Sequence, residues 1–295
     1  MSRKITFKGN PLTLVGRVLN VGAQAPDFKV TSQDLKEVTG YDFKDKIKLI
    51  SSFPSLDTPV CDLQVKEFNK RASGISKDVV IIGISKDLPF AQKRFCQAHE
   101  IKNEIVLSDY KFSSFGINYG LLIKELSLLA RAVLIVDKNN FVRYIQIAEE
   151  MTNALNFEDA LKNLQEVANS PAMVIKGKPL PSKCVPCEGQ VLPLSKERIE
   201  TLMAQERGWE LAEGKKLVKE FKFSDFIEQK YFVDLVAIIA EEQGHHPVLT
   251  LIYNKLKVTL TTHAADGLTE NDFIMARIID DLGYVEWKEP TSYAS

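Results

Sequence analysis

Apolar positions in the first half of the chain follow the pattern of buried strands that alternate with helices. Three largely apolar runs have the length of buried strands and cover residues 47–52, 79–85 and 132–137. Helical spacing of apolar positions is found at residues 63–72, 89–99 and 157–169. The expected antiparallel pairs are 5–7 with 12–15, and 132–137 with 141–145 across the turn at 138–140. This alternation predicts an α/β sheet that is covered on both faces.

Roughly the last hundred residues follow a different pattern, in which strands come in pairs between helices. The expected order is helix, two strands, helix, two strands and helix, over residues 195–204, 209–211, 217–223, 225–243, 249–253, 256–262 and 267–281. Ser195 is the expected N-cap of the first helix, and Ser224 or Asp225 that of the second. With both strand pairs antiparallel, we expect an α+β domain, a four-stranded antiparallel sheet with helices on one face.

The two patterns are separated by a segment with the Pro, Gly and Lys density of a linker. A chain of 295 residues is long for one core, so we expect two domains, residues 1–171 and 191–295, joined by a linker at 172–190. The linker holds a Cys-x-x-Cys pair, Cys184 and Cys187. A zinc site would need a second Cys pair, and a redox pair should begin a helix, whereas prolines bracket this one. We favour a tether without chemistry, and redox or metal use stays open.

Composition and charge narrow the classes of function. The formal net charge is −1, which gives no positive field for nucleic acid. No uncharged run is long enough to span a bilayer, and the first residues lack the apolar core of a signal peptide, so we expect a cytoplasmic protein. Four cysteines are too few for a disulfide scaffold in a chain of this size, so they point to redox chemistry or metal binding.

Cys61 lies where the expected strand at 47–52 gives way to the helix that follows. At a helix start, free backbone N–H groups and the positive end of the helix dipole favour an anion, and the thiolate is the nucleophilic form of cysteine. The Thr58 hydroxyl can lie beside the sulfur, while Pro54 and Pro59 stiffen the turn. The alternative is a small buried side chain without chemistry.

The stretch Phe-Pro-Ser-Leu-Asp-Thr-Pro-Val-Cys-Asp at residues 53–62 resembles the peroxidatic site of peroxiredoxins, and of their thiol peroxidase branch in particular. The resemblance covers residues 3 to about 170 and includes the segments 7–13, 21–22, 25–28 and 128–133. It implies a thioredoxin-like fold and reduction of hydroperoxides by Cys61, with Thr58 beside the sulfur and Pro54 orienting the turn.

The same resemblance implies roles for two residues further along the chain. Taken alone, Cys96 fits a buried structural cysteine equally well. By the resemblance it corresponds to the resolving cysteine, which attacks the Cys61 sulfenic acid and closes a disulfide. The two helices should partly unwind for the sulfurs to meet, because a disulfide needs a short Cα separation. A thioredoxin-like reductant would then regenerate the thiols. Arg131 corresponds to the residue that reaches the Cys61 thiolate and polarises the peroxide O–O bond.

Three of the four histidines, His245, His246 and His263, lie close together in the second half. Taken alone, they fit a metal site or a chance grouping. The pattern that carries a resemblance to pterin-4a-carbinolamine dehydratase is Glu-x-x-x-His-His-Pro at 241–247, Tyr-Asn at 253–254, His263, and Gly-Leu-Thr-x-x-Asp at 267–272. It spans residues 184 to about 284, and the Cys-Val-Pro-Cys-Glu-Gly lead-in resembles that of bacterial members. Leu249 departs from the family, which often has an aromatic residue there.

This second resemblance implies that a 4a-hydroxytetrahydropterin loses water, which needs a proton on the leaving hydroxyl and removal of a ring proton. His245 and His263 are the implied acid–base pair, and His246 positions or assists. The residues that would orient a histidine or bind the pterin are Glu241, Pro247 and Asp272. The resemblance implies neither a metal nor a cofactor.

Together the resemblances imply a bifunctional enzyme, a thioredoxin-dependent peroxidase joined to a dehydratase that forms quinonoid dihydropterin in tetrahydropterin recycling. The expected partners are thioredoxin or a similar reductant, a hydroperoxide, a pterin and a pterin-dependent aromatic amino acid hydroxylase. We expect a homo-oligomer and neither nucleic acid nor membrane partners. Two alternatives stay open: the second half is a binding or dimerisation module, or Cys184 and Cys187 serve as an internal reductant.

Overall fold

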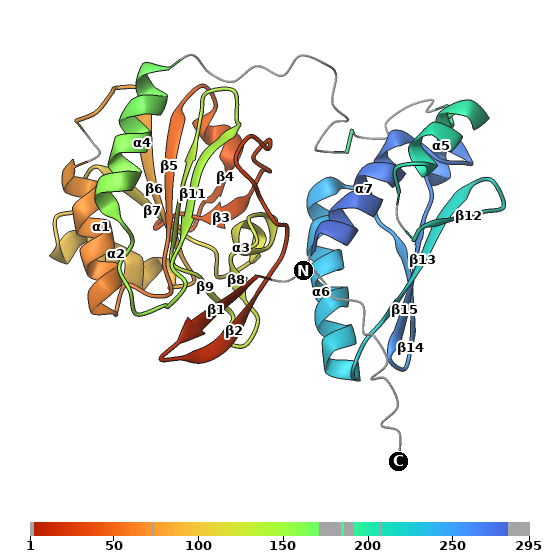
Figure 1. The fold of residues 1–295 in the computed structure, drawn as a ribbon, viewed down its shortest axis with the longest axis horizontal. Helices are drawn as coiled ribbons and strands as arrows, with labels where there is room; N and C mark the ends of the chain where they lie inside the picture. Colours follow the sequence, from red (N-terminus) through yellow and green to blue (C-terminus); the bar gives the residue numbers. More distant parts are fainter. Residues whose placement is uncertain (1–2, 72–73, 171–183, 186–191, 207, 283–295) are drawn as a thin grey trace. The chain divides into compact units, whose positions relative to one another are not determined.

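The computed structural model describes residues 3–71, 74–170, 184–185, 192–206 and 208–282. The chain forms two compact units, Ser2–Gly177 and Lys178–Ser295. Each unit has its own sheet and its own buried core (Figure 1). Among the described residues, no helix is long and apolar enough to cross a bilayer.

A seven-stranded mixed sheet, in the order β11-β10-β5-β6-β7-β3-β4, forms the centre of the first unit. Its strands are β3 (Lys29–Thr31), β4 (Glu37–Thr39), β5 (Ile47–Ser52), β6 (Val79–Ser85), β7 (Glu104–Ser108), β10 (Ala132–Val136) and β11 (Val142–Ile147). The three central strands β5, β6 and β7 are parallel, and the others are antiparallel to their neighbours. The expected α/β class and the pairing of β10 with β11 are confirmed.

The first unit also contains a small four-stranded sheet in the order β1-β2-β8-β9. Its strands are β1 (Lys4–Phe7), β2 (Asn10–Val15), β8 (Leu122–Ile123) and β9 (Leu128–Leu129). β1 and β2 form the expected hairpin, with Ile5 opposite Leu12. Strands β8 and β9 were not expected, because two residues are too few to show a period.

Helices α1 (Pro59–Arg71), α2 (Pro89–Ala98) and α4 (Phe157–Asn169) lie on one face of the large sheet, and the short α3 (Ser114–Asn118) lies on the other (Figure 1). The three long helices agree with the expected ranges. One difference concerns α1, which begins at Pro59 rather than near residue 63. Proline is well suited to the first helical position, where its missing N–H would have no intrahelical partner. Cys61 therefore lies within the first turn of α1.

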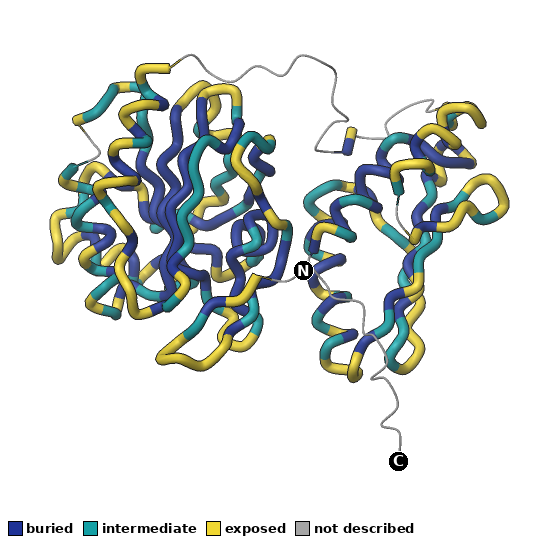
Figure 2. Tube along the Cα trace, in the orientation of Figure 1, coloured by how far each residue is buried: buried dark blue, intermediate teal, exposed yellow. Residues whose placement is uncertain are grey.

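Strand β10 shows why a central strand of this sheet can be apolar at every position. Leu134 and Val136 point into the cluster on the α3 side of the sheet, whereas Val133 and Ile135 point into the cluster beneath α1 and α4. Successive side chains of a strand point to opposite faces, so a strand covered on both sides needs apolar residues at every position. Figure 2 shows these strands as the buried centre of the unit.

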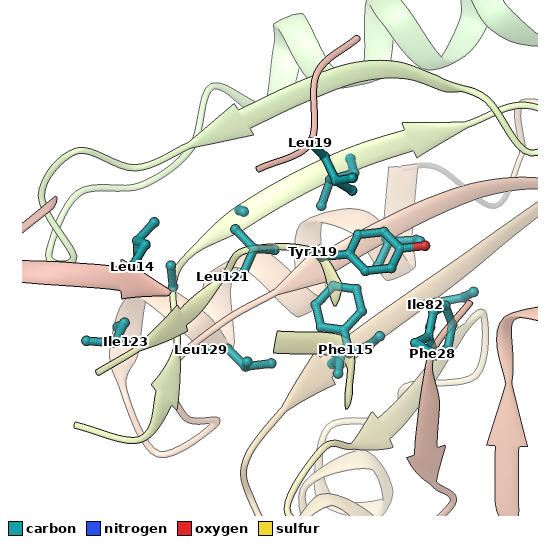
Figure 3. Close-up of a cluster of buried hydrophobic side chains, with 14 of the residues drawn as sticks. Leu14, Leu19, Phe28, Ile82, Phe115, Tyr119, Leu121, Ile123 and Leu129 are labelled. Atoms are coloured by element: carbon teal, nitrogen blue, oxygen red, sulfur yellow. The ribbon is translucent and has the colours of Figure 1, made fainter. Parts of the chain in front are cut away.

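On the α3 side, the largest cluster combines aliphatic side chains with the aromatic rings of Phe28, Phe115 and Tyr119 (Figure 3). The ring centroids of Phe28 and Phe115 are 5.7 Å apart at nearly a right angle, and Phe115 stacks on Tyr119 at 4.6 Å. Such edge and offset contacts add about 0.5–1.5 kcal/mol per pair to the burial of the rings. This cluster covers the face of the sheet opposite to α1, α2 and α4.

The second unit is an antiparallel four-stranded sheet in the order β12-β13-β15-β14, and it confirms the expected α+β class. Its elements are α5 (Lys196–Met203), β12 (Glu210–Ala212), β13 (Lys216–Lys222), α6 (Phe226–Gln243), β14 (Val248–Ile252), β15 (Lys255–Leu260), the 3-10 turn His263–Ala265 and α7 (Glu270–Asp281). Leu256, Val258 and Leu260 are buried, while the residues between them are not. One face of the sheet therefore carries the core, and the helices pack on it (Figure 1).

Helix caps in this unit follow the sequence signals. Ser195 and Asp225 accept hydrogen bonds from backbone N–H groups of the first turns of α5 and α6. Gly244 ends α6 with φ at 62°, in the left-handed region that glycine adopts without strain. This turn of the backbone leads directly into His245 and His246.

Candidate active sites

Cys61 is completely buried in the first turn of α1. The Thr58 hydroxyl donates a hydrogen bond to its sulfur over 2.8 Å, and the Thr58 carbonyl accepts the Cys61 N–H over 3.1 Å. The positive end of the α1 dipole acts on the same atom, because the effect is concentrated in the first turn of a helix. A hydroxyl donor and a helix start thus both lie at this sulfur.

The turn that precedes Cys61 is held by a residue that the sequence interpretation missed. Asp87, just after β6, accepts hydrogen bonds from the Ser55 hydroxyl over 2.7 Å and from the Leu56 N–H over 2.8 Å. Pro54, in the same turn, is buried. The carboxyl ends of parallel strands meet at one edge of a sheet, so Asp87 could have been found from its place after a buried strand beside β5.

Arg131 is buried, but no hydrogen bond joins it to Cys61 among the described residues. Its Nη1 donates to the Gln64 side-chain oxygen over 3.0 Å, and its Nε and Nη2 donate to the Met151 carbonyl. Gln64 in turn donates to the Ser51 hydroxyl over 2.8 Å. The guanidinium is thus held by Gln64, which lies one helical turn after Cys61 in α1 and presents its side-chain oxygen to Arg131. That spacing was visible in the sequence.

Cys96 belongs to the same buried apolar cluster as Cys61. The other members of the cluster are Phe53, Leu56, Val65 and Val106. Both thiols are free, and the Gln33 amide donates a hydrogen bond to the Cys96 sulfur over 3.3 Å. Burial raises the pKa of the Cys96 thiol, and the charge of Glu104 adds to the rise, whereas the Gln33 hydrogen bond opposes it. The structure thus brings the two expected cysteines into one cluster.

In the second unit, His245 and Asp272 form a buried pair. Their Nε2 and Oδ1 atoms are 2.7 Å apart. The other oxygen of Asp272 accepts the Thr262 hydroxyl and the Thr269 N–H, each over 2.8 Å. Asp272 therefore caps α7, orients His245 and ties down the residue that directly precedes His263. Thr262 was not singled out from sequence, because its role depends on this tertiary contact, whereas Thr269 belongs to the Gly-Leu-Thr-x-x-Asp pattern and meets Asp272 within the first turn of α7.

The other two expected histidines are exposed. His246 Nε2 lies 3.2 Å from a carboxylate oxygen of Glu241, one turn back along the chain at the end of α6. His263 begins the 3-10 turn that follows β15. Pro247 is half-buried between the histidine pair and β14. The arrangement offers one buried imidazole fixed by a carboxylate and two imidazoles open to solvent.

Cys184 is the one described residue of the Cys-x-x-Cys pair, and it is buried. Its N–H donates to the Gln243 side chain over 3.0 Å, and its thiol lies 3.6 Å from the Asn271 carbonyl. Val185 and Asn271 exchange two hydrogen bonds. This part of the expected linker is thus packed on the second unit, while Cys187 and most of 172–190 lie outside the described residues. No group of three or more His, Cys, Asp or Glu residues suited to a metal ion occurs among the residues described.

Two protein families match separate parts of the chain. The AhpC/TSA family matches residues 21–145, and the pterin 4 alpha carbinolamine dehydratase family matches residues 192–282. The mixed sheet and the cysteine cluster of the first unit define a peroxiredoxin-type domain. The chain belongs to the thiol peroxidase family and carries a pterin-4a-carbinolamine dehydratase domain as its second unit.

Individual relatives are matched over almost their whole length. The thiol peroxidase of Staphylococcus epidermidis is 49% identical over 164 residues, which are 56% of this chain and 99% of that protein. The thiol peroxidase of Listeria innocua is 46% identical over 159 residues, 54% of this chain and 96% of that protein. The crystal structure of a peroxiredoxin-like protein from Aquifex aeolicus superposes with a TM-score of 0.53 at 40% identity, covering 56% of this chain and 97% of that one.

Proposed function

We propose that the first unit reduces hydroperoxides through Cys61. The observation that carries the proposal is the 2.8 Å hydrogen bond from Thr58 to a buried sulfur in the first turn of α1. The thiolate attacks one peroxide oxygen, the O–O bond breaks, and the other oxygen leaves with a proton as alcohol or water. Cys61 becomes a sulfenic acid. Arg131, held by Gln64 and Met151, supplies the nearby positive charge that stabilises the departing oxygen.

Cys96 completes the proposed cycle as the resolving cysteine. Its sulfur attacks the Cys61 sulfenic acid, the S–O bond breaks, and the proton of the Cys96 thiol leaves with the oxygen as water. A thioredoxin-type dithiol then reduces the disulfide, as the kinship with thiol peroxidases implies. The membership of both cysteines in one cluster supports this pairing.

Cys96→Ser is expected to react once with hydroperoxide and then stop. The sulfenic acid forms on Cys61, but no second thiol of the unit closes a disulfide that thioredoxin could reduce. The measurement is peroxide consumed per chain, with and without thioredoxin and its reductase, together with intact mass after one turnover. Sustained thioredoxin-dependent turnover by Cys96→Ser, at the rate of the native protein, would contradict the assignment.

For the second unit we propose dehydration of 4a-hydroxytetrahydropterin to quinonoid dihydropterin. The His245–Asp272 pair supports this, because a buried carboxylate fixes one imidazole while His263 and His246 remain open to a substrate. Imidazoles titrate near neutrality, as the required proton transfers demand. The test follows the absorbance change of freshly generated 4a-hydroxytetrahydropterin with and without the protein. If the protein does not accelerate the reaction over its spontaneous rate, the proposed dehydratase activity is wrong.

A binding or dimerisation module is the second candidate for this unit, and one observation favours association. Strand β14 is the last strand of its sheet, so one edge is unpaired within the described part of the chain. Val248, Leu251, Ile252 and Tyr253 are exposed there, the last by 70%. Edge strands with exposed apolar residues pair readily with other chains, which supports the expected homo-oligomer. Association and dehydration are compatible, and the enzymatic assay separates a catalytic unit from a binding unit.

The fusion itself fits pterin recycling. Reduced pterins release hydrogen peroxide by side reaction with oxygen, so a dehydratase that serves a pterin-dependent aromatic amino acid hydroxylase benefits from a tethered peroxidase. A tether raises the effective concentration of one site near the other without a channel.

Residues 1–172 and 180–295, expressed separately, are expected to keep full activity on isolated substrates, because each unit has its own core. The measurement compares turnover of each fragment with that of the intact chain. An insoluble or inactive fragment would show instead that one unit completes the other.

A further inference from the structure

Glu104 is a buried acid that the proposed reaction does not use. It is the first residue of β7, its exposed fraction is 6%, and neither carboxylate oxygen has a hydrogen-bond partner among the described residues. Burial raises the pKa of this carboxyl well above its ordinary value, because a buried carboxylate loses its hydration. Buried polar groups are almost always paired, so an unpaired carboxyl calls for an explanation.

The Glu104 side chain lies on the same face of the sheet as the cluster that holds Cys61 and Cys96. Glu104 and Val106 are two residues apart in β7 and so point to the same face, and Val106 is a member of the cluster that holds Cys61 and Cys96. Gly83 of the neighbouring strand β6 leaves the space that the carboxyl occupies. A Cβ at Gly83 would overlap Oε1 of Glu104 and would lie 3.4 Å from the Phe53 ring.

No positively charged group pairs with Glu104 among the residues that the structure describes. From α1 the titratable group in the cluster is the Cys61 thiol, and from α2 it is the Cys96 thiol, whose pKa the Glu104 charge helps to raise. Asp62 and His99, 4.0 Å apart, form a partly exposed pair at the outer side of α1 and α2. Gly83 of β6 contributes no charge. The acid thus belongs to the packing of α1 and α2 on the sheet, and no ion pair of the described part of the chain stabilises it there.

We propose that Glu104 is a positioning residue for the resolution step, whose unpaired carboxyl weakens the packing of α2 on β7 and so helps to release Cys96 toward the oxidised Cys61. The proposal rests on the proposed peroxidase function. Disulfide geometry allows only short Cα separations, so Cys96 reacts when α2 departs from its closed position. That opening gives the carboxyl access to water and removes the penalty of an unsatisfied buried group.

The sign of the pH dependence follows from linkage. A carboxyl whose pKa is raised in the closed state and ordinary in the open state binds more protons when closed, so opening becomes easier as pH rises above the ordinary value of about 4.3. Above the raised pKa of the closed state, a further increase in pH no longer makes opening easier. The Cys96 thiolate fraction also increases with pH, so the experiment must separate the two effects.

Two variants of Glu104 separate them. Glu104→Leu removes the unsatisfied polar atoms at similar volume, and we expect disulfide formation after a hydroperoxide pulse to be about tenfold slower. Slower resolution leaves the Cys61 sulfenic acid exposed to a second peroxide, so sulfinic acid should accumulate. Glu104→Gln keeps a buried polar group of the same shape but cannot ionise. It should lack the part of the pH-dependent acceleration that ionisation of Glu104 gives the native protein above the ordinary carboxyl pKa of about 4.3.

The readout is the rate of Cys61–Cys96 disulfide formation, followed by acid quench, thiol alkylation and intact mass, with the rate of Cys61 oxidation measured on the same samples. The first oxidation should be unchanged in both variants. Glu104→Leu that resolves at the native rate, or Glu104→Gln with the native pH profile, overturns the proposal. Should Glu104→Leu fail to fold, the Glu104→Gln profile decides alone. Native protein that forms no Cys61–Cys96 disulfide would instead overturn the resolving role of Cys96.

Discussion

Cys61→Ser is expected to lower hydroperoxide turnover at least about a thousandfold, to the level of the uncatalysed reaction. Serine keeps the size and the Thr58 contact of the residue, but its hydroxyl is not ionised at neutral pH and does not attack the O–O bond. None of the other described cysteines combines the first turn of a helix with a hydroxyl donor at the sulfur. The measurement is peroxide consumption in the presence of thioredoxin and its reductase.

Cys184→Ser is the matched control for this experiment. Cys184 is buried like Cys61, but its partners Gln243 and Asn271 belong to the second unit. Its replacement should leave peroxide turnover within about twofold of the native rate, because it offers no nucleophile to the first unit. A large loss in Cys184→Ser would revive the internal-reductant alternative. Residual thioredoxin-dependent turnover in Cys61→Ser would require another peroxidatic residue.

Asp272→Ala is expected to impair the second unit in both stability and activity. The carboxylate joins His245, Thr262 and Thr269 at the start of α7 and is fully buried. Its removal takes away a helix cap and leaves buried polar groups unpaired, which together should lower the free energy of unfolding by about 3 kcal/mol. Loss of the group that orients His245 should reduce kcat for pterin dehydration about a hundredfold.

Asp272→Asn separates the two effects. The amide keeps the shape and one oxygen acceptor, so most of the stability should return, while kcat should stay low because the charge that fixes His245 is absent. Thermal unfolding should be read as separate transitions for the two units. Glu241→Gln is a stability control, since its contact with His246 is exposed and should contribute less than about 0.5 kcal/mol. If Asp272→Asn keeps the native kcat for dehydration, Asp272 does not act by orienting His245.

The sequence by itself determined the architecture of both units. Central strands such as β6 and β10 are covered on two faces, so their almost continuous apolar runs predicted them from the sequence, and α4 was placed at its observed bounds. The N-caps Ser195 and Asp225 could be predicted from the sequence, because capping depends on neighbours within one helical turn. Cys61 was identified for the same reason, since Thr58 and the helix start lie within three residues of it.

Only the tertiary structure decided how distant residues complete the sites. Arg131 meets Gln64 across 67 positions of the chain, and His245 meets Asp272 across 27. The unpaired state of Glu104 is likewise invisible in sequence, because a charged residue at a strand end normally faces water. Local signals report period, caps and turns, which depend on adjacent residues. Which polar groups pair, and which stay alone in the core, is set by strand order and by the packing of helices on the sheet.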